Sequence, residues 1–151
     1  MKKTVLLIGP VTRRAGYGEQ ARFALRSLRA HEGRFNILIQ DIPWGKSGMV
    51  SEDNEEQRYI RENIAKTQQY LHHQRPVDIT LQVTIPNEFK KIAPVNIGYT
   101  AGIETTRVSP QWIQQATLMD KIILVSNHSK DVYEKTSYEG TNSETGEKVI
   151  I

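Results

Sequence analysis

The chain contains no cysteine, and this absence excludes several classes of protein at once. Disulfide-stabilised scaffolds, thiolate zinc sites, cysteine nucleophiles and iron–sulfur clusters all depend on that residue. Long hydrophobic runs are lacking as well. No apolar stretch approaches the roughly 20 residues that a membrane span needs, and the run after Met1-Lys2-Lys3 is too short for the apolar core of a signal peptide. We therefore expect a cytoplasmic protein.

Charge of one sign is also scarce. Lys and Arg number 20 and Asp and Glu number 17, so the formal net charge is only +3. Nucleic-acid binding rests on clustered rather than total charge, so this excess does not predict it. The 151 residues suit one domain, and a hydrophobic content of 38% is enough for a buried core and too high for a disordered chain.

Short apolar runs alternate along the chain with longer polar segments that have the period of a helix. The runs that we predict as strands are residues 5–8, 35–40, 77–83, 95–99 and 122–125. The predicted helices are residues 19–31, a helix that Ser51 caps and that ends near residue 74, residues 110–119, and a helix that Ser126 caps and that ends near residue 135. This alternation predicts a Rossmann-like α/β fold, a doubly wound parallel sheet in a three-layer α/β/α arrangement.

The first two predicted helices each have an apolar face. The face of the first helix is formed by Ala21, Ala24, Leu25 and Leu28, which are spaced at helical intervals. The residues of the second helix that we expect to face inward are Ile60, Ile64 and Leu71. Both helices should therefore pack against the sheet.

The last part of the chain is polar and then becomes apolar again. Residues 136–147 contain Gly140 and Gly146 and are predicted to form an exposed loop. Residues 148–151 have the composition of the start of a further strand. We therefore expect residues 1–151 to be one domain of a longer protein.

Open parallel sheets bind their ligands beyond the carboxyl ends of the strands. Four segments are predicted to lie there, namely residues 9–18, 41–48, 84–89 and 100–109. The last segment is the richest in polar side chains. These segments are therefore where we expect a functional site.

The loop over residues 9–18 leads directly into a helix, whose first N–H groups favour anions. Arg13 and Arg14 add positive charge to this loop. It is not a phosphate-binding loop of the Walker type, because no Gly-Lys-Ser/Thr follows, and it lacks the dinucleotide fingerprint, because Val11 and Arg14 stand where that pattern has glycines. The simplest interpretation of Gly16 and Gly18 is a tight turn that requires a positive φ.

Five motifs occur along the chain in a fixed order. They are GYGEQAR at 16–22, DIPWG at 41–45, YTAGIETT at 99–106, PQWI at 110–113 and MDKIILVSN at 119–127. Together they resemble the N-terminal half of GT-B glycosyltransferases of the family 4 type, and the resemblance covers essentially the whole chain. It implies two Rossmann-like domains that face each other across a cleft, of which this chain would be the N-terminal, acceptor-binding one.

The resemblance also implies roles for particular residues. The residues expected near the donor phosphates are Arg13, Arg14, Gly16, Tyr17 and Gly18. The residues expected on the acceptor side are Asp41, Trp44, Thr100, Gly102 and Thr105. Glu104 is the expected catalytic residue, because it would face the transferred sugar and could hydrogen-bond to the acceptor hydroxyl or act as its base. Trp44 could stack on a sugar, although a tryptophan in such a loop more often anchors it against the core.

The partners follow from the same resemblance. The C-terminal domain of a GT-B enzyme binds the nucleotide sugar, so we expect that domain and the nucleotide-sugar donor as partners and expect no turnover by residues 1–151 alone. No metal and no permanently bound cofactor are expected, since the sequence contains no Asp-x-Asp motif. The acceptor cannot be read from the sequence.

Two questions stay open at the level of sequence. The first is whether the domain is instead a non-catalytic α/β module that binds a nucleotide or another ligand in the same crevice. The second concerns Arg22, Arg26 and Arg29, which lie opposite the apolar face of the first predicted helix. They form either a solvated face or a basic ridge that contacts anionic lipid headgroups at the inner membrane surface.

Overall fold

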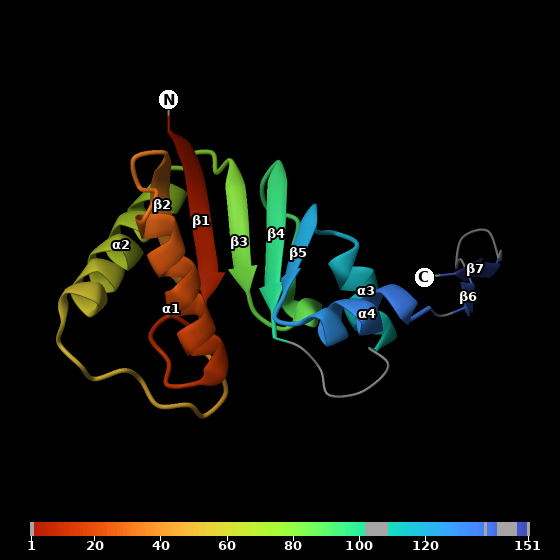
Figure 1. Cartoon of the computed structure of the whole chain (residues 1–151). Coiled ribbons are helices and arrows are strands. Elements are labelled where there is room, and N and C mark those ends of the chain that lie inside the picture. Colours follow the sequence, from red (N-terminus) through yellow and green to blue (C-terminus); the bar gives the residue numbers. More distant parts are fainter. Residues whose placement is uncertain (1, 102–108, 138, 142–147, 151) are drawn as a thin grey trace.

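Five parallel strands form the main sheet of the computed structural model, which describes residues 2–101, 109–137, 139–141 and 148–150. The strands are β1 (Lys3–Gly9), β2 (Phe35–Asp41), β3 (Ile79–Val83), β4 (Val95–Thr100) and β5 (Lys121–Leu124). Their order across the sheet is β2-β1-β3-β4-β5, and all four pairings are parallel. The predicted Rossmann-like alternation of strands and helices is thereby confirmed (Figure 1).

Four α-helices and one short 3-10 helix connect the strands in the part of the chain that is described. They are α1 (Gly16–Arg29), α2 (Glu55–His72), η1 (Pro86–Glu88), α3 (Pro110–Ala116) and α4 (Asn127–Lys135). Ser126 caps α4 as predicted, by accepting a hydrogen bond from the backbone N–H of Ser129. The third predicted helix is too long, because α3 ends at Ala116 rather than at residue 119.

The start of α2 differs from the prediction. Its N-cap is Asn54, whose side chain accepts a hydrogen bond of 2.9 Å from the backbone N–H of Gln57. Ser51, the predicted cap, lies three residues before Asn54, and its hydroxyl accepts a hydrogen bond from Arg14 instead. Asparagine and serine are about equally good caps, so local composition could not choose between them.

One face of the sheet packs against α1 and holds the main hydrophobic core. Leu7, Ile39 and Val83 come from three neighbouring strands, and Ala21 and Leu25 of α1 pack against them. Leu7, Ile39, Val83, Ala21 and Leu25 are all fully buried. The predicted apolar face of the first helix is thus confirmed, with Leu28 only partly buried at its end.

The α2 helix covers the free edge of β2 at one end of the sheet (Figure 1). Thr67 is buried on this helix, and its hydroxyl oxygen accepts a 2.8 Å hydrogen bond from the backbone N–H of Ile39 in β2. Ile60 is buried as predicted, whereas Leu71 is 38% exposed, so its predicted inward orientation is wrong. The helix turns a polar residue toward the strand because an edge strand has unpaired N–H groups that need a partner.

The opposite face of the sheet is polar at β3 and β4 and is covered by the segment over residues 85–94. The amide of Gln82 accepts from the backbone N–H of Lys90 and donates to its carbonyl. Asn96 accepts hydrogen bonds from the backbone N–H groups of Ile92 and Ala93. These buried amides fix a connection that would otherwise be a long unsupported loop.

The end of the chain forms a small separate sheet. Two short strands, β6 (Glu139–Thr141) and β7 (Lys148–Ile150), pair in an antiparallel hairpin. The prediction of one uninterrupted loop over residues 136–147 is therefore wrong at β6. The predicted strand after residue 147 is present, but it pairs with β6 and not with the main sheet.

Candidate binding site at the carboxyl ends of the strands

Tyr17 connects three of the predicted site segments at the carboxyl ends of the strands. Its hydroxyl lies 2.9 Å from the hydroxyl oxygen of Thr100, at the end of β4, and accepts a hydrogen bond of 3.1 Å from the backbone N–H of Ala101. Its ring lies against the ring of Trp44, with centroids 4.6 Å apart and planes tilted by 40°. The structure therefore brings together Tyr17, Trp44 and Thr100, which lie far apart in the sequence.

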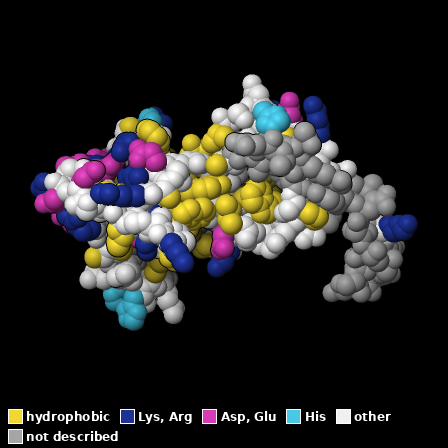
Figure 2. All heavy atoms as spheres, turned by 90° about the horizontal axis from the view of Figure 1, so that it is seen from below, with side chains coloured by type: hydrophobic (Ala, Val, Ile, Leu, Met, Phe, Trp, Pro, Cys, Tyr) yellow, Lys and Arg dark blue, Asp and Glu magenta, His cyan; other side chains and the backbone are white. Residues whose placement is uncertain are grey.

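These three residues differ in burial. Thr100 is fully buried, whereas Tyr17 and Trp44 are half-buried. Seen from the carboxyl ends of the strands, the middle of the molecule carries hydrophobic side chains, and the α1–α2 end carries most of the charged ones (Figure 2). A partly exposed aromatic pair with a buried polar group behind it is suited to a ligand that has both apolar and hydroxyl surfaces.

Gly18 places Tyr17 by allowing two backbone segments to come very close. A Cβ atom at Gly18 would lie 2.1 Å from the carbonyl oxygen of Arg13 and 3.0 Å from that of Pro10. The predicted reason for this glycine, a positive φ, is wrong, because positive φ is found among the described glycines only at Gly45. Gly16 has no positive φ either, so the predicted turn requirement is wrong there as well, and a Cβ at Gly16 would meet nothing within 4 Å.

Asp41 lies at the end of β2, where the sequence predicted an acceptor-side acid. Its two carboxylate oxygens accept hydrogen bonds from the backbone N–H and the hydroxyl of Thr12, at 3.2 and 2.7 Å. This contact ties the end of β2 to the β1–α1 loop. Sequence reasoning missed Thr12, because nothing in a single threonine signals a contact with a residue 29 positions away.

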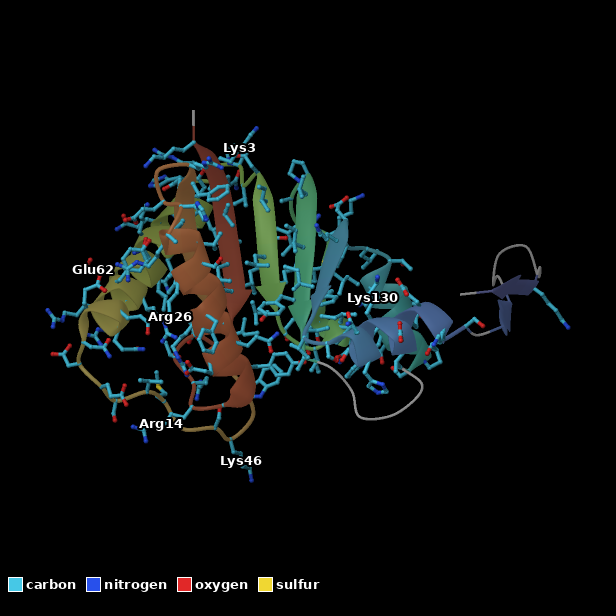
Figure 3. The ribbon with its side chains drawn as sticks, viewed as in Figure 1. Lys3, Arg14, Arg26, Lys46, Glu62 and Lys130 are labelled. Atoms are coloured by element: carbon cyan, nitrogen blue, oxygen red, sulfur yellow. The ribbon has the colours of Figure 1, made fainter. Side chains whose placement is uncertain are left out.

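The basic pair of the β1–α1 loop is directed toward the loop that follows β2. Arg13 donates a hydrogen bond of 3.2 Å to the carbonyl oxygen of Ser47, and Arg14 donates one of 2.8 Å to the hydroxyl of Ser51. The backbone N–H of Arg14 also donates to the carbonyl of Gly48. Arg13 is thus mainly a structural residue, while Arg14 lies on the surface below α1 (Figure 3).

The first turn of α1 borders a hollow of about 600 Å³. No side chain caps this helix, so its first N–H groups are not satisfied by a capping residue. Arg14 and Arg26 line the hollow, but Glu19, Glu52 and Glu56 line it too. The helix end attracts an anion, while the three carboxylates oppose one, so the hollow is not a dedicated phosphate site.

The predicted basic ridge of α1 is largely neutralised by acidic residues. Arg29 of α1 forms an ion pair of 2.5 Å with Glu55 of α2, and Arg26 of α1, whose side chain extends toward α2, pairs with Glu56 at 2.6 Å (Figure 3). These hydrogen bonds raise the pKa of both guanidinium groups and lower the pKa of the Glu55 carboxyl. The ridge therefore joins two helices.

Arg22 does not belong to a solvated face. Its side chain is buried, with the residue only 7% exposed, and it donates hydrogen bonds to the carbonyl oxygens of Val11 and Arg13 at 3.0 and 2.9 Å. It also pairs with Glu19 at 2.8 Å, and this hydrogen bond lowers the pKa of the Glu19 carboxyl. The expected exposure of Arg22 is therefore wrong, because the loop before α1 folds back over it.

Tyr133 of α4 is a site residue that the sequence did not reveal. Its hydroxyl is buried and has no hydrogen-bond partner within the described ranges. Burial first, and the nearby Tyr17 second, raise its pKa above that of an ordinary tyrosine. Its hydroxyl is therefore a buried polar group without a partner among the described residues, close enough to Tyr17 for the two phenols to affect each other electrostatically. Tyr133 lies far from Tyr17 in the sequence, so no local pattern could have linked them.

Three of the predicted site residues cannot be placed. Gly102, Glu104 and Thr105 lie outside the described residues. Among the residues that are described, no group of three His, Asp or Glu side chains could hold a metal ion. None of the described helices is both long enough and apolar enough to cross a membrane. Comparison with known families, curated proteins and solved structures finds no match for this chain.

Proposed function

We propose that the chain is the acceptor-binding N-terminal domain of a GT-B glycosyltransferase that transfers a sugar from a nucleotide sugar. The observation that carries this proposal is the meeting of Tyr17, Trp44 and Thr100 at the carboxyl ends of parallel strands. Ligands of open α/β sheets bind at that edge. The proposal includes the finer architecture, a doubly wound three-layer α/β/α domain that forms half of a two-domain enzyme.

An acceptor sugar matches the chemistry of this cluster. The C–H faces of a sugar ring pack on aromatic rings, and Trp44 and Tyr17 offer two adjoining rings that are partly exposed. The hydroxyl groups of a sugar need hydrogen-bond partners, and the hydroxyl of the half-buried Tyr17 can supply one. An acceptor held there would lie next to the first turn of α1.

In this proposal, different groups bind the donor phosphate and act on the acceptor hydroxyl. The N–H groups of the first turn of α1, which no side chain caps, would contribute with Arg14 to holding the departing phosphate. A second domain would supply the positive charge that offsets the carboxylates of this hollow. Glu104 would hydrogen-bond to the acceptor hydroxyl or take its proton. The nucleotide sugar acts as a substrate, with no metal and no resident cofactor, and the reaction would take place in the cytoplasm.

The test is an assay of sugar transfer with two proteins, residues 1–151 alone and the same residues joined to their native continuation. A panel of uridine- and guanosine-diphosphate sugars serves as donor. We expect transfer by the longer protein and almost none by residues 1–151. Glu104→Ala in the longer protein should lower the rate more than tenfold with the fold intact. Robust turnover by residues 1–151 alone, or a continuation without a second α/β domain, would contradict the proposal.

Acceptor binding can be followed separately by fluorescence. The chain has two tryptophans, so Trp112→Phe leaves Trp44 as the only one. In that background, saturable changes in emission with saccharides are expected. Adding Tyr17→Phe keeps the ring against Trp44 but removes the hydroxyl, and it should weaken binding at least fivefold. A response that is identical with and without the Tyr17 hydroxyl would remove this residue from the site.

A non-catalytic α/β binding module remains the second candidate, and the strand order favours it. The order 2-1-3-4-5 also occurs in proteins that bind a flavin nucleotide at the point where the order reverses. In this chain that point lies between β1 and β3, beside the β1–α1 loop. Micromolar binding of a free nucleotide by residues 1–151, without transfer by the longer protein, would favour the module.

A further inference from the structure

The two edge strands of the main sheet differ in what covers them. The edge at β2 is covered by α2, and Thr67 satisfies a backbone N–H of that strand. At the other edge, β5 pairs with β4 and with no further strand of the described chain. Open edges of parallel sheets are uncommon when the edge strand is apolar, because its unpaired backbone groups and side chains attract another strand.

The open edge carries apolar side chains that a soluble surface would not normally expose. Ile123 is 41% exposed in β5, and Val125, which follows the strand, is 54% exposed. Between β5 and α4 lies a groove of about 620 Å³. Ile122, Leu124, Val125 and Tyr133 form its apolar wall, and Ser126, Asn127, Lys130 and Glu134 line the rest. The strand and the apolar wall of the groove form one border.

We propose that this border is the docking site for β7 of the same chain, which exchanges its pairing with β6 for pairing with β5 and becomes a sixth parallel strand. The proposal concerns the sheet and does not depend on the proposed function. It assigns one occupant to the border, a segment only 24 residues after β5 along the sequence.

The chain between β5 and β7 is suited to a crossover that joins two parallel strands. A strand followed by a helix returns to the same sheet by a right-handed crossover in nearly all proteins, and α4 directly follows β5. Residues 136–147 join α4 to β7, and twelve residues can span up to about 40 Å when extended. The α4 helix has nine residues and is about 14 Å long, so the connection easily reaches back along it.

The composition of β7 fits the sheet better than it fits the hairpin. Lys148-Val149-Ile150-Ile151 is a continuous apolar run after its first residue, as in strands that are buried on both faces. Its present partner, β6, is Glu139-Gly140-Thr141, and glycine and glutamate are poor strand formers. A hairpin of three residues per strand is marginally stable by itself, and Figure 1 shows this hairpin beyond α4 and apart from the main sheet.

Spin labels can distinguish the two pairings, because the chain has no cysteine of its own. Lys121 and Lys148 are exposed and lie near the starts of β5 and β7, so Lys121→Cys with Lys148→Cys reports docking. Thr141→Cys with Lys148→Cys reports the hairpin, since these residues are register partners. In the full chain we expect a label separation below about 15 Å for the first pair, because neighbouring strands lie about 5 Å apart, and a loss of the short separation for the second pair.

Every outcome of this comparison is informative. A short separation that is confined to the Thr141–Lys148 pair would overturn the proposal. A short Lys121–Lys148 separation that appears only when the two labels are on different molecules would also overturn it, since a second copy would then fill the edge. Val149→Pro removes a backbone donor from β7 and should abolish the Lys121–Lys148 contact, while circular dichroism confirms that the five-stranded sheet persists.

Discussion

At the scale of single residues, the space around each position of the β1–α1 loop decides which side chain that position tolerates. A Cβ atom added at Gly18 would lie 2.1 Å from the Arg13 carbonyl oxygen. A Cβ atom added at Gly16, two positions earlier, would have nothing within 4 Å. Both belong to the same motif and look alike in the sequence. The difference between them appears only when the loop is folded against α1.

We predict opposite effects of alanine at these two glycines. Gly18→Ala should lower the free energy of unfolding by about 1–3 kcal/mol, because the loop must move to admit the methyl group. Gly16→Ala should leave it unchanged or raise it by up to about 1 kcal/mol, because alanine is the better helix former. Urea denaturation of the two variants measures both effects. Equal losses would show that the close approach is not the reason for the glycine.

Arg22 and Arg26 provide a second matched pair on one helix. Arg22→Met should lower the free energy of unfolding by about 2–4 kcal/mol, because it leaves the carbonyls of Val11 and Arg13 without their donor. Arg26→Met removes a partly exposed ion pair with Glu56 and should cost about 1 kcal/mol or less. The same denaturation experiment compares them, and a larger loss at Arg26 would contradict the structural role of Arg22.

At the scale of elements, the cap of α2 is a direct test of the observed boundary. Asn54→Ala should lower the free energy of unfolding by about 1 kcal/mol, because the N–H of Gln57 loses its acceptor. Ser51→Ala removes only an exposed hydrogen bond to Arg14 and should change it by less than about 0.5 kcal/mol. If Ser51 proves the costlier of the two, the helix begins where the sequence predicted.

The ion pairs formed by the α1 arginines should make the stability of the chain depend on pH. Arg22 and Arg29 lower the pKa of Glu19 and Glu55 below the ordinary value of 4.5, so the ionised forms stabilise the folded chain. This stability is fully present above about pH 4.5, the unfolded value, and is lost as the pH falls through the lower folded values. We expect the difference in unfolding free energy between the wild type and Glu19→Gln to shrink between pH 5 and pH 3. Glu62→Gln, on the outer face of α2, is the control (Figure 3); a difference that stays constant with pH would contradict the ion-pair role.

Most elements of the main sheet could be predicted because apolar runs and helical periods are local signals. The five strands and the apolar face of α1 depend on residues that are close in sequence. The β6–β7 pairing could not be predicted, since a three-residue strand such as Glu139–Thr141 carries no pattern of its own. Leu71 was misplaced because its position near the end of α2 leaves its side chain only partly covered, while Thr67 meets a backbone donor.

The sequence predicted where in the sheet the candidate site lies, but not which side chains contact one another there. The rule for open sheets selected the segments that hold Tyr17, Trp44 and Thr100, and the structure brings these three residues together. The partners Thr12 and Tyr133 are separated from Asp41 and Tyr17 by many residues. The Thr12–Asp41 contact and the influence of Tyr17 on Tyr133 exist only in the folded chain, so they could not be read from the sequence.

At the scale of the whole molecule, the net charge of +3 and the pairing of the α1 arginines bear on the predicted membrane contact. Arg22 is buried, and Arg26 and Arg29 are held by glutamates of α2. We therefore expect equal sedimentation with neutral vesicles and with vesicles containing anionic lipid at low salt. Stronger binding to the anionic vesicles, reduced by Arg26→Gln with Arg29→Gln, would support a lipid contact through this ridge.

Because α2 covers the edge at β2, the described sheet can be extended at the β5 edge only. The hydroxyl of Thr67 in α2 already accepts the hydrogen bond of the Ile39 backbone N–H. An extra strand therefore cannot be added at that edge without displacing α2. Any extension, from the same polypeptide or from a neighbour, has to proceed outward from β5. Head-to-tail stacking of molecules into an endless ribbon would need two receptive edges, and the described sheet has one, so its architecture opposes such stacking.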